Sequence, residues 1–313
     1  MRAATISDGS VTIEEHPDPE PGSGELLVRV RAAGLNGADI LQRKGAYPAP
    51  PGSPADIPGM EFAGEVVGQG PGTSRFSDGD RVMALVGGGA QAELVTVHER
   101  QAMPVPDVLD WPAAGGFPEV FTVAHDALFT QAGLRAGERL LVHGGAGGMG
   151  TAAVQLGRAA GARVTATVRY EGLRPDVERL GATAIDSEGF EEHGPFDVVL
   201  ELVGGPNMPG NLKALDPDGR IVVIGVGAGP TTELNLLALM GKRARIQGST
   251  MRARPLEEKA VVARRVESQV LPLVEAGVIE VPVAGSFPLD QVGEAYDRFT
   301  AGRKFGKVVL LSG

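Results

Sequence analysis

The feature that most constrains this chain is a glycine cluster between an apolar segment and a helical one. Residues 140–143 read Leu-Leu-Val-His, and Gly145, Gly147 and Gly150 then follow the spacing Gly-x-Gly-x-x-Gly. Such spacing serves a tight turn, a close approach of backbone to a pyrophosphate, and close packing of helix on strand. The N–H groups and the dipole at the helix start favour bound phosphate. We expect a dinucleotide to be bound by the backbone of Gly145, Ala146, Gly147, Gly148, Met149 and Gly150.

The neighbours of this cluster matter because glycine makes up 46 of the 313 residues, so the spacing alone is weak evidence. A strand is predicted over Glu138–Val142, a helix over Thr151–Ala160, and a second strand over the β-branched segment Arg163–Val168. Gly161 follows the helix, where glycine commonly ends one. Together these segments make one βαβ unit. The alternative is a glycine-rich turn in an α/β domain that binds nothing.

The end of the second predicted strand bears on the choice of nucleotide. An NAD site usually has an acid there, which binds the ribose 2′-hydroxyl. This chain has Arg169 at that point and Arg174 one helical turn later, and a guanidinium suits the 2′-phosphate of NADPH. We therefore expect NADPH rather than NADH. Two alternatives stay open: Glu171 acts as the NAD-type acid, or both arginines are ordinary surface charges.

Composition excludes several classes of function. The formal net charge is −10 without a basic patch, which argues against binding to nucleic acid or to an anionic membrane surface. The chain has no cysteine, and therefore no disulfide framework and no thiolate chemistry. No apolar run is long enough to span a membrane, and the first residues lack the apolar core of a signal peptide. These features predict a cytoplasmic protein.

The order of predicted elements indicates an α/β chain with two domains. Short strands over 25–31, 61–67, 81–86 and 91–97 precede a region in which strands and helices alternate. Phe196–Val203 is a continuous apolar strand of the kind buried on both faces, and Leu256–Ala276 is predicted to be one long amphipathic helix. We assign residues 114–249 to a doubly wound parallel-sheet domain, and residues 1–113 and 250–313 to a β-rich domain.

Several stretches together resemble the medium-chain dehydrogenases/reductases, specifically their zinc-free quinone oxidoreductase (zeta-crystallin-like) branch. Besides the glycine cluster, they are Ala33–Pro48, Pro58–Val66, Gly79–Val82, Pro118–Ala124, Gly219–Gly225 and Gly306–Leu310. The resemblance covers nearly the whole chain. It implies a GroES-like β-rich domain, a Rossmann domain that binds the cofactor, and a homodimer joined at sheet edges near Ala244–Gln247.

The resemblance also implies that no metal is bound. Zinc alcohol dehydrogenases of this superfamily have a cysteine where this chain has Asn36 and a histidine where it has Met60. Their structural zinc is held by four cysteines, and this chain has none. The five histidines show no ligand spacing. We interpret His143 as structural and His125 as a packed helix residue, and expect Glu61 to serve in domain packing.

Candidate site residues follow from the same resemblance. Asn36 replaces the first metal ligand and is expected to contact the nicotinamide ribose or the substrate oxygen. Tyr47 is expected to donate a hydrogen bond to that oxygen, or else only to pack. Thr122 is placed near the nicotinamide, Gly225 and Val226 near its carboxamide, and Val203 with Gly204 beside the adenosine half. Lys307 either reaches the cofactor or is a surface lysine.

The function that these expectations favour is hydride transfer from NADPH to a quinone or another electron-poor conjugated carbonyl. Without a Lewis acid nothing lowers the pKa of an alcohol, whereas a quinone accepts hydride directly. One alternative is the reduction of an enoyl thioester or enone, and another is a tailoring reductase of a biosynthetic pathway. A third, of a different class, is a nucleotide-binding protein with little catalysis.

Overall fold

The computed structural model describes all residues from Met1 to Gly313, and they form two compact units. Unit 1 comprises Met1–Thr122, Met251–Gly302 and Lys307–Gly313, and unit 2 comprises Val123–Thr250 and Arg303–Gly306. The boundary therefore falls inside helix α3 (Pro118–His125). None of the helices combines the length and the apolar character that crossing a membrane requires.

Unit 1 is built on a seven-stranded sheet with the order β14-β15-β3-β4-β5-β7, in which β6 also pairs with β3. The strands are β3 (Glu25–Gly34), β4 (Glu61–Gln69), β5 (Arg81–Leu85), β6 (Leu94–His98), β7 (Met103–Pro104), β14 (Val283–Pro288) and β15 (Lys307–Leu311). A separate hairpin joins β1 (Arg2–Ser7) to β2 (Ser10–Glu15). Fully buried side chains such as Val28, Phe62 and Val82 fill the core of the sheet. The β-rich domain predicted from the sequence is confirmed.

The helices of unit 1 are α1 (Gly37–Arg43), α2 (Trp111–Gly115), most of α3, α8 (Leu256–Gln269), α9 (Leu271–Glu275) and α10 (Val292–Thr300), with the 3₁₀ turn η5 (Leu289–Gln291). The prediction of one long helix over Leu256–Ala276 is wrong. The chain breaks at Val270 (φ −108°, ψ −44°), and a second short helix starts at Leu271. Pro272 explains the break, since proline has no N–H and its ring disfavours a helical residue before it.

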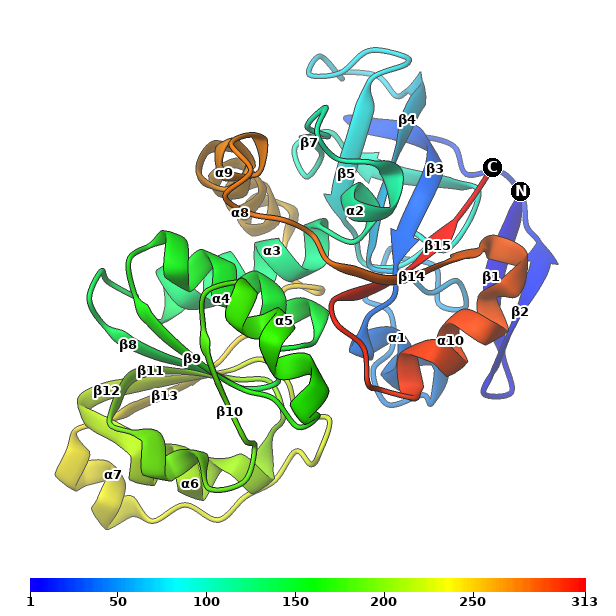
Figure 1. Ribbon diagram of the computed structural model, residues 1–313. Helices are drawn as coiled ribbons and strands as arrows, with labels where there is room; N and C mark the ends of the chain where they lie inside the picture. The colour runs from blue at the N-terminus through cyan, green and yellow to red at the C-terminus, as the bar shows by residue number, and fades with distance from the viewer. The chain divides into compact units, whose positions relative to one another are not determined.

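Unit 2 contains a six-stranded sheet, all parallel, with the order β10-β9-β8-β11-β12-β13. Helices α4 and α5 lie on one face of it and α6 and α7 on the other (Figure 1). The doubly wound prediction is confirmed. The strands are β8 (Arg139–Val142), β9 (Arg163–Thr167), β10 (Thr183–Ile185), β11 (Phe196–Glu201), β12 (Leu215–Val223) and β13 (Arg245–Gly248). The helices are α4 (Gly148–Ala159), α5 (Arg174–Arg179), α6 (Met208–Ala214) and α7 (Leu236–Lys242), with the π-helix η1 (Asp126–Gln131) and the 3₁₀ turns η2 (Glu171–Leu173), η3 (Phe190–His193) and η4 (Gly205–Asn207).

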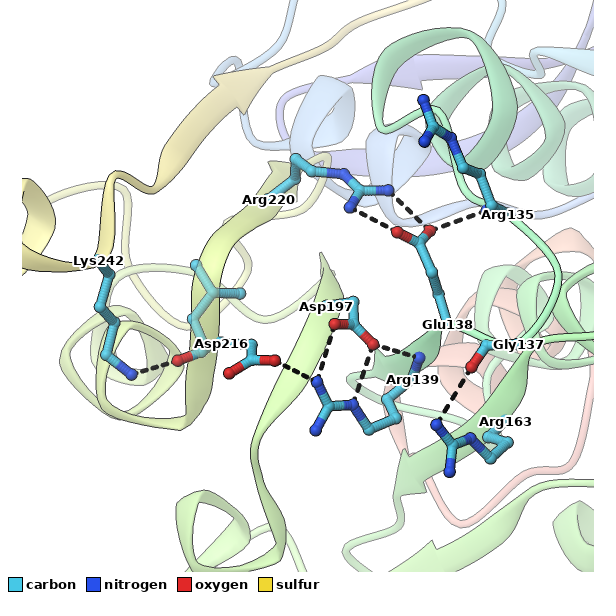
Figure 2. A network of polar contacts seen from close by, with 10 residues as sticks. Arg135, Gly137, Glu138, Arg139, Arg163, Asp197, Asp216, Arg220 and Lys242 are labelled. Atoms are coloured by element: carbon cyan, nitrogen blue, oxygen red, sulfur yellow. Dashed lines mark hydrogen bonds and ion pairs between the residues drawn. The ribbon is translucent and has the colours of Figure 1, made fainter.

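An ionic network ties together strands of this sheet near their amino-terminal ends (Figure 2). The guanidinium of Arg139 donates to both carboxylate oxygens of Asp197, at 2.9 and 2.8 Å, and also contacts Asp216. Arg220 pairs with Glu138 through two bonds of 2.8 Å. Arg139 lowers the pKa of Asp197, chiefly through these hydrogen bonds. The network holds the amino-terminal ends of these strands together. The loops described next follow the carboxyl ends of the strands.

Candidate active site

The glycine cluster in unit 2 forms the turn from β8 into α4. The helix begins at Gly148, three residues earlier than predicted, and its N-cap Gly147 provides no capping side chain. A Cβ on Gly145 would lie 2.7 Å from Cβ of Ala166, and one on Gly150 would overlap the carbonyl of Gly144. A Cβ on Gly147 would meet only Gly144 O, at 3.5 Å. Gly145 and Gly150 thus serve internal packing, and the first-turn N–H groups remain available to a phosphate.

Glu201, at the end of β11, holds the loop that follows it. Its Oε1 accepts the N–H groups of Val203 at 2.6 Å and Gly204 at 2.8 Å. Its Oε2 accepts Asn211 Nδ2 at 2.5 Å, and both side chains are fully buried. The predicted strand over Phe196–Val203 therefore ends two residues early, because these N–H groups bind a carboxylate. Sequence reasoning did not single out Glu201 as a positioning group.

His143 continues the same buried chain of hydrogen bonds toward the glycine cluster. Glu201 can only accept, so Asn211 presents its NH₂ to it and its Oδ1 to His143 Nε2, which is 2.7 Å away. Nε2 then carries the ring proton, and Nδ1 accepts from the Thr167 hydroxyl at 3.2 Å. Thr167 Oγ1 in turn accepts the Gly144 N–H at 3.1 Å. Burial lowers the pKa of His143, which favours this neutral ring. His143 thus has a structural role, as predicted: its ring links Asn211 to Thr167 by hydrogen bonds.

The loop after β12 lies against the loop after β11. The Gly225 N–H donates to Glu201 O at 3.2 Å, and a Cβ on Gly225 would overlap Leu202 O. Ala228 N–H donates to Val203 O at 2.9 Å, and Val226 is 41% exposed. The predicted residues Val203, Gly225 and Val226 are thus brought together at the carboxyl edge of the parallel sheet, where open α/β sheets bind ligands.

Beyond the end of β9, two guanidinium groups flank the ring of Tyr170. The centre of the Arg169 guanidinium lies 5.5 Å from the ring centroid and that of Arg303 lies 5.2 Å from it. Arg174 is engaged differently, since its Nη2 donates to Asp186 at 2.6 Å. Glu171 starts the turn η2 and is exposed. Arg169 and Arg303 therefore both lie against the Tyr170 ring, beyond the end of β9, and are called the arginine pair below.

Arg303 was not predicted, because it comes 133 positions after Tyr170 in the sequence. The short segment Arg303–Gly306 belongs to unit 2, although the residues on both sides of it belong to unit 1. The Gly306 N–H donates to Ala146 O at 2.9 Å, and Gly306 forms an isolated parallel bridge with Gly147. The segment thus returns to the glycine cluster itself.

A buried charge cluster in unit 1 surrounds Asn36. The Lys307 ammonium lies 2.6 Å from Asn36 Oδ1, 2.6 Å from Glu61 Oε1 and 2.9 Å from Leu35 O. Asn36 Nδ2 donates to Glu61 Oε1 at 2.9 Å. None of Asn36, Glu61 and Lys307 is more than 6% exposed. Of the two alternatives for Lys307, the surface lysine is therefore wrong.

Two further carboxyl groups belong to this cluster. Asp39 accepts the N–H groups of Asn36 at 2.8 Å and Gly59 at 3.1 Å, and its burial raises its pKa to about 6 despite these bonds. Loss of solvent around the carboxyl of Glu119 raises its pKa to about 8, with Lys307 opposing the shift and Glu61 adding to it. Glu119 therefore holds a proton at neutral pH. Asn36, Glu61 and Lys307 were singled out from the sequence, whereas Asp39 and Glu119 were not.

Tyr47 lies against Arg252. The Arg252 guanidinium is 5.2 Å from the Tyr47 ring centroid and donates to Tyr47 O at 3.2 Å, to Gly87 O at 2.7 Å and to Gln42 Oε1 at 2.5 Å. The Tyr47 hydroxyl forms no hydrogen bond within the chain. Thr122 is 4% exposed, and its hydroxyl also has no partner. The Tyr47 hydroxyl, on a partly exposed residue, is therefore available to a ligand, whereas the Thr122 hydroxyl is buried and unpartnered.

Comparison with known proteins agrees with this architecture. Residues 22–107 match the sequence profile of the alcohol dehydrogenase GroES-like domain, and residues 180–310 match that of the zinc-binding dehydrogenases. The quinone oxidoreductase of Mus musculus is 32% identical, with 94% of this chain and 91% of that protein covered. The synaptic vesicle membrane protein VAT-1 homolog of Rattus norvegicus is 30% identical, with 94% of this chain and 78% of that protein covered.

Solved structures show the same fold. An alcohol dehydrogenase superfamily protein from Novosphingobium aromaticivorans has a TM-score of 0.88 at 30% identity, with 99% of both chains covered. A mycobacterial protein solved as a complex with NADPH has a TM-score of 0.90 at 25% identity, with 99% of this chain and all of the other covered. The chain therefore belongs to the quinone oxidoreductase family of the medium-chain dehydrogenases/reductases, a family of oxidoreductases that depend on a nicotinamide dinucleotide.

Proposed function

We propose that this protein transfers hydride from NADPH to a quinone or another electron-poor conjugated carbonyl. The observation that carries the proposal is the uncapped start of α4, with the pair Arg169 and Arg303 at the end of the neighbouring strand β9. The first feature suits a pyrophosphate and the second a 2′-phosphate. The reduced nicotinamide, when bound, supplies the hydride. The similarity to the mouse quinone oxidoreductase supports the class of acceptor.

The cofactor roles that we propose follow from these positions. The backbone of residues 145–150 binds the pyrophosphate, and Arg169 with Arg303 binds the 2′-phosphate. Val203 borders the adenosine half, and Gly225 and Val226 offer backbone groups to the carboxamide. The unpartnered hydroxyl of Thr122 is assigned to the nicotinamide half. The mycobacterial structure that contains NADPH supports this choice of nucleotide.

We further propose that the reaction uses no zinc, although part of the chain matches the zinc-binding dehydrogenases. The donor set does not fit the metal. Asn36 binds the ammonium of Lys307 through the oxygen that a metal would need, and Glu61 Oε1 binds the same ammonium. Met60 is an apolar core residue, and no three His, Asp or Glu side chains are arranged to hold a metal ion.

Because the cofactor supplies the hydride, the side chains need only orient the acceptor and donate a hydrogen bond to its oxygen. Hydride addition to a quinone gives a hydroquinone anion, which needs one proton and, before that, a donor to its oxygen. The Tyr47 hydroxyl can donate that hydrogen bond. Asn36, held in one orientation by Glu61 and Lys307, is proposed to contact the nicotinamide ribose or the substrate oxygen. Orientation of the reactants and exclusion of water provide the rest of the rate enhancement.

The test is the loss of reduced-nicotinamide absorbance with the purified protein. NADPH and NADH are compared over a panel of para-quinones, ortho-quinones, enones and enoyl thioesters. We expect the fastest turnover with NADPH and a quinone. Turnover confined to enoyl thioesters would replace the proposal by the alternative of an enoyl reductase. Binding of NADPH without turnover of any acceptor would overturn the enzymatic assignment.

A further inference from the structure

Arg252 of unit 1 is a buried cation that forms no ion pair. The residue is 3% exposed, and its guanidinium donates only to neutral acceptors. These are Gly87 O at 2.7 Å, Tyr47 O at 3.2 Å and Gln42 Oε1 at 2.5 Å. The hydrogen bonds satisfy part of the guanidinium but leave its charge without a contacting anion. A cation buried in this way is costly to keep away from water.

The acid whose charge acts on Arg252 is Asp39, but its carboxylate is engaged with other groups. Desolvation lowers the pKa of Arg252, and Asp39 opposes this shift from a distance. The carboxylate oxygens of Asp39 accept the N–H groups of Asn36 at 2.8 Å and Gly59 at 3.1 Å, and Nε2 of Gln91 at 3.3 Å. Asp39 therefore offsets the charge of Arg252 only in part.

The loop that follows α1 is held by neutral groups as well, so it does not need this charge. Gln42 Nε2 donates to Ala55 O at 3.0 Å. A Cβ on Gly87 would lie 2.9 Å from Pro50 Cγ, so the loop packs closely on the backbone at that glycine. Packing and neutral hydrogen bonds of this kind fix a loop without a buried cation. The charge of Arg252 is therefore free for another role.

The group nearest to this charge on the acceptor side is Tyr47. The Arg252 guanidinium lies 5.2 Å from the centroid of its ring, and the Tyr47 hydroxyl forms no hydrogen bond within the chain. A positive charge beside a phenol makes its O–H a stronger hydrogen-bond donor. It also stabilises a negative charge on the oxygen that accepts this bond, most strongly where water is excluded.

We propose that the charge of Arg252, acting through Tyr47, stabilises the negative charge that hydride transfer places on the acceptor oxygen. Hydride addition to a quinone gives a hydroquinone anion, which is the counter-charge that Arg252 lacks in the free protein, and water then supplies the proton that completes the hydroquinone. Arg252 is thus a positioning residue with an electrostatic effect, and the site binds a phenolate better than the neutral phenol. This inference rests on the proposed function, because it concerns the acceptor of that same reaction.

The kinetic test separates the charge of Arg252 from its hydrogen bonds. Arg252→Met should lower kcat/KM for an uncharged para-quinone about tenfold or more, with the KM for NADPH hardly changed. Arg252→Lys should keep most of the wild-type value, because it keeps the charge although one nitrogen cannot reach all three acceptors. In the Tyr47→Phe background, Arg252→Met should cost less than in the wild-type protein. Arg100→Met, at a surface arginine paired with Glu257, is the control and should keep the wild-type value.

Two kinetic outcomes would overturn the proposal. Equal losses in Arg252→Met and Arg252→Lys would leave Arg252 as a structural clamp. An undiminished loss in the Tyr47→Phe background would show that Arg252 does not act through the hydroxyl. Melting temperatures identify any variant that fails to fold, and Arg252→Lys then carries the comparison with the wild-type protein and with Tyr47→Phe.

A binding measurement tests the charge without turnover. The probe is para-nitrophenol, whose ionised form resembles the hydroquinone anion and is visible in its absorbance. Bound to the wild-type protein, it should ionise at a lower pH than in free solution, and Arg252→Met should abolish this shift. The same ionisation in both proteins, or no binding to the wild-type protein, would refute the electrostatic effect. If the wild-type protein oxidises NADPH with no quinone but shifts the ionisation of para-nitrophenol, the proposed function fails and the effect of Arg252 stands.

Discussion

Lys307 Nζ lies 2.6 Å from Glu61 Oε1, and neither side chain is more than 4% exposed. The pair joins the first residue of β15 to the first residue of β4, and Asn36 is bonded to both partners. Two opposite charges removed from water in this way depend on each other, because either one alone would be strongly destabilising.

Glu61→Gln should therefore destabilise unit 1. Removing one partner of a buried ion pair typically costs about 3–5 kcal/mol, since the other charge remains unpaired. Urea unfolding followed by circular dichroism measures the change. The double variant Glu61→Gln/Lys307→Met should recover part of the loss, because it removes both charges. A matched surface pair, Arg100 with Glu257, provides the control, and Glu257→Gln should have little effect. Equal losses in the two variants would contradict this account.

The raised pKa of Glu119 predicts a pH dependence of stability. In the unfolded chain its carboxyl has the ordinary value of 4.5, and in the folded protein the pKa is about 8. Between these values the folded state holds a proton that unfolding releases, so stability from this group falls as the pH rises through the window. Glu119→Gln should flatten the decrease in melting temperature between about pH 5 and pH 8. Glu178→Gln, at an exposed site, should keep the wild-type slope, and the same slope in Glu119→Gln would exclude the shift.

The pair Arg169 and Arg303 should determine the choice of nucleotide. Arg169→Ala and Arg303→Ala should each raise the Michaelis constant for NADPH about tenfold or more, because each loses a charge-assisted bond to the 2′-phosphate. The Michaelis constant for NADH should hardly change. Arg163→Ala is the control, since Arg163 lies at the other end of β9 and donates to Gly137 O. Equal effects on the two nucleotides would refute the assignment.

The chain of hydrogen bonds from Glu201 to Gly144 should affect both nucleotides alike. Glu201→Gln places an NH₂ group where a carboxylate oxygen now accepts from Val203, Gly204 or Asn211, so one donor must face another. We expect weaker binding of NADPH and NADH by the same factor, measured by nicotinamide fluorescence. In the wild-type protein, nitrogen NMR should find the ring proton of His143 on Nε2. Unchanged binding, or a proton on Nδ1, would show that the chain does not position these loops.

The edge strand of unit 2 predicts a homodimer. β13 pairs only with β12, and Ile246 on it is 36% exposed. Leu236, Leu237 and Met240 of α7 are 64%, 79% and 69% exposed. We expect a second copy to extend the sheet and cover these side chains. Light scattering after size exclusion should give twice the chain mass of 32.3 kDa, and Leu237→Lys/Ile246→Lys should give the single-chain mass. Val108→Lys, at an equally exposed residue of unit 1, should remain a dimer. A wild-type protein of single-chain mass would contradict the prediction.

The sequence predicts those parts of the protein that neighbouring residues determine. The glycine cluster, the flanking strands and the presence of a doubly wound parallel sheet follow from local spacing and composition, whereas the order of its strands comes only from the structure. The contacts of Lys307 with Asn36 and of Arg303 with Tyr170 do not, because long stretches of chain separate the partners. The role of Glu201 could not be predicted for another reason, because the sequence pattern places it inside a predicted apolar strand. Only the two N–H groups that it binds reveal that it ends that strand.

The order of strands in unit 1 has a consequence for the growing polypeptide. β3 (Glu25–Gly34) forms antiparallel pairs with β15 (Lys307–Leu311), and β15 also provides the parallel partner of β14. β6 (Leu94–His98) covers residues 25–29 on this edge of β3 early in synthesis, but residues 32–34 pair there with β15 and must wait until the ribosome has reached the end of the printed sequence. Residues 123–250 of unit 2 are complete much earlier. On the ribosome, the parallel sheet of unit 2 can therefore form before the sheet of unit 1, which is begun first, receives its last strands β14 and β15.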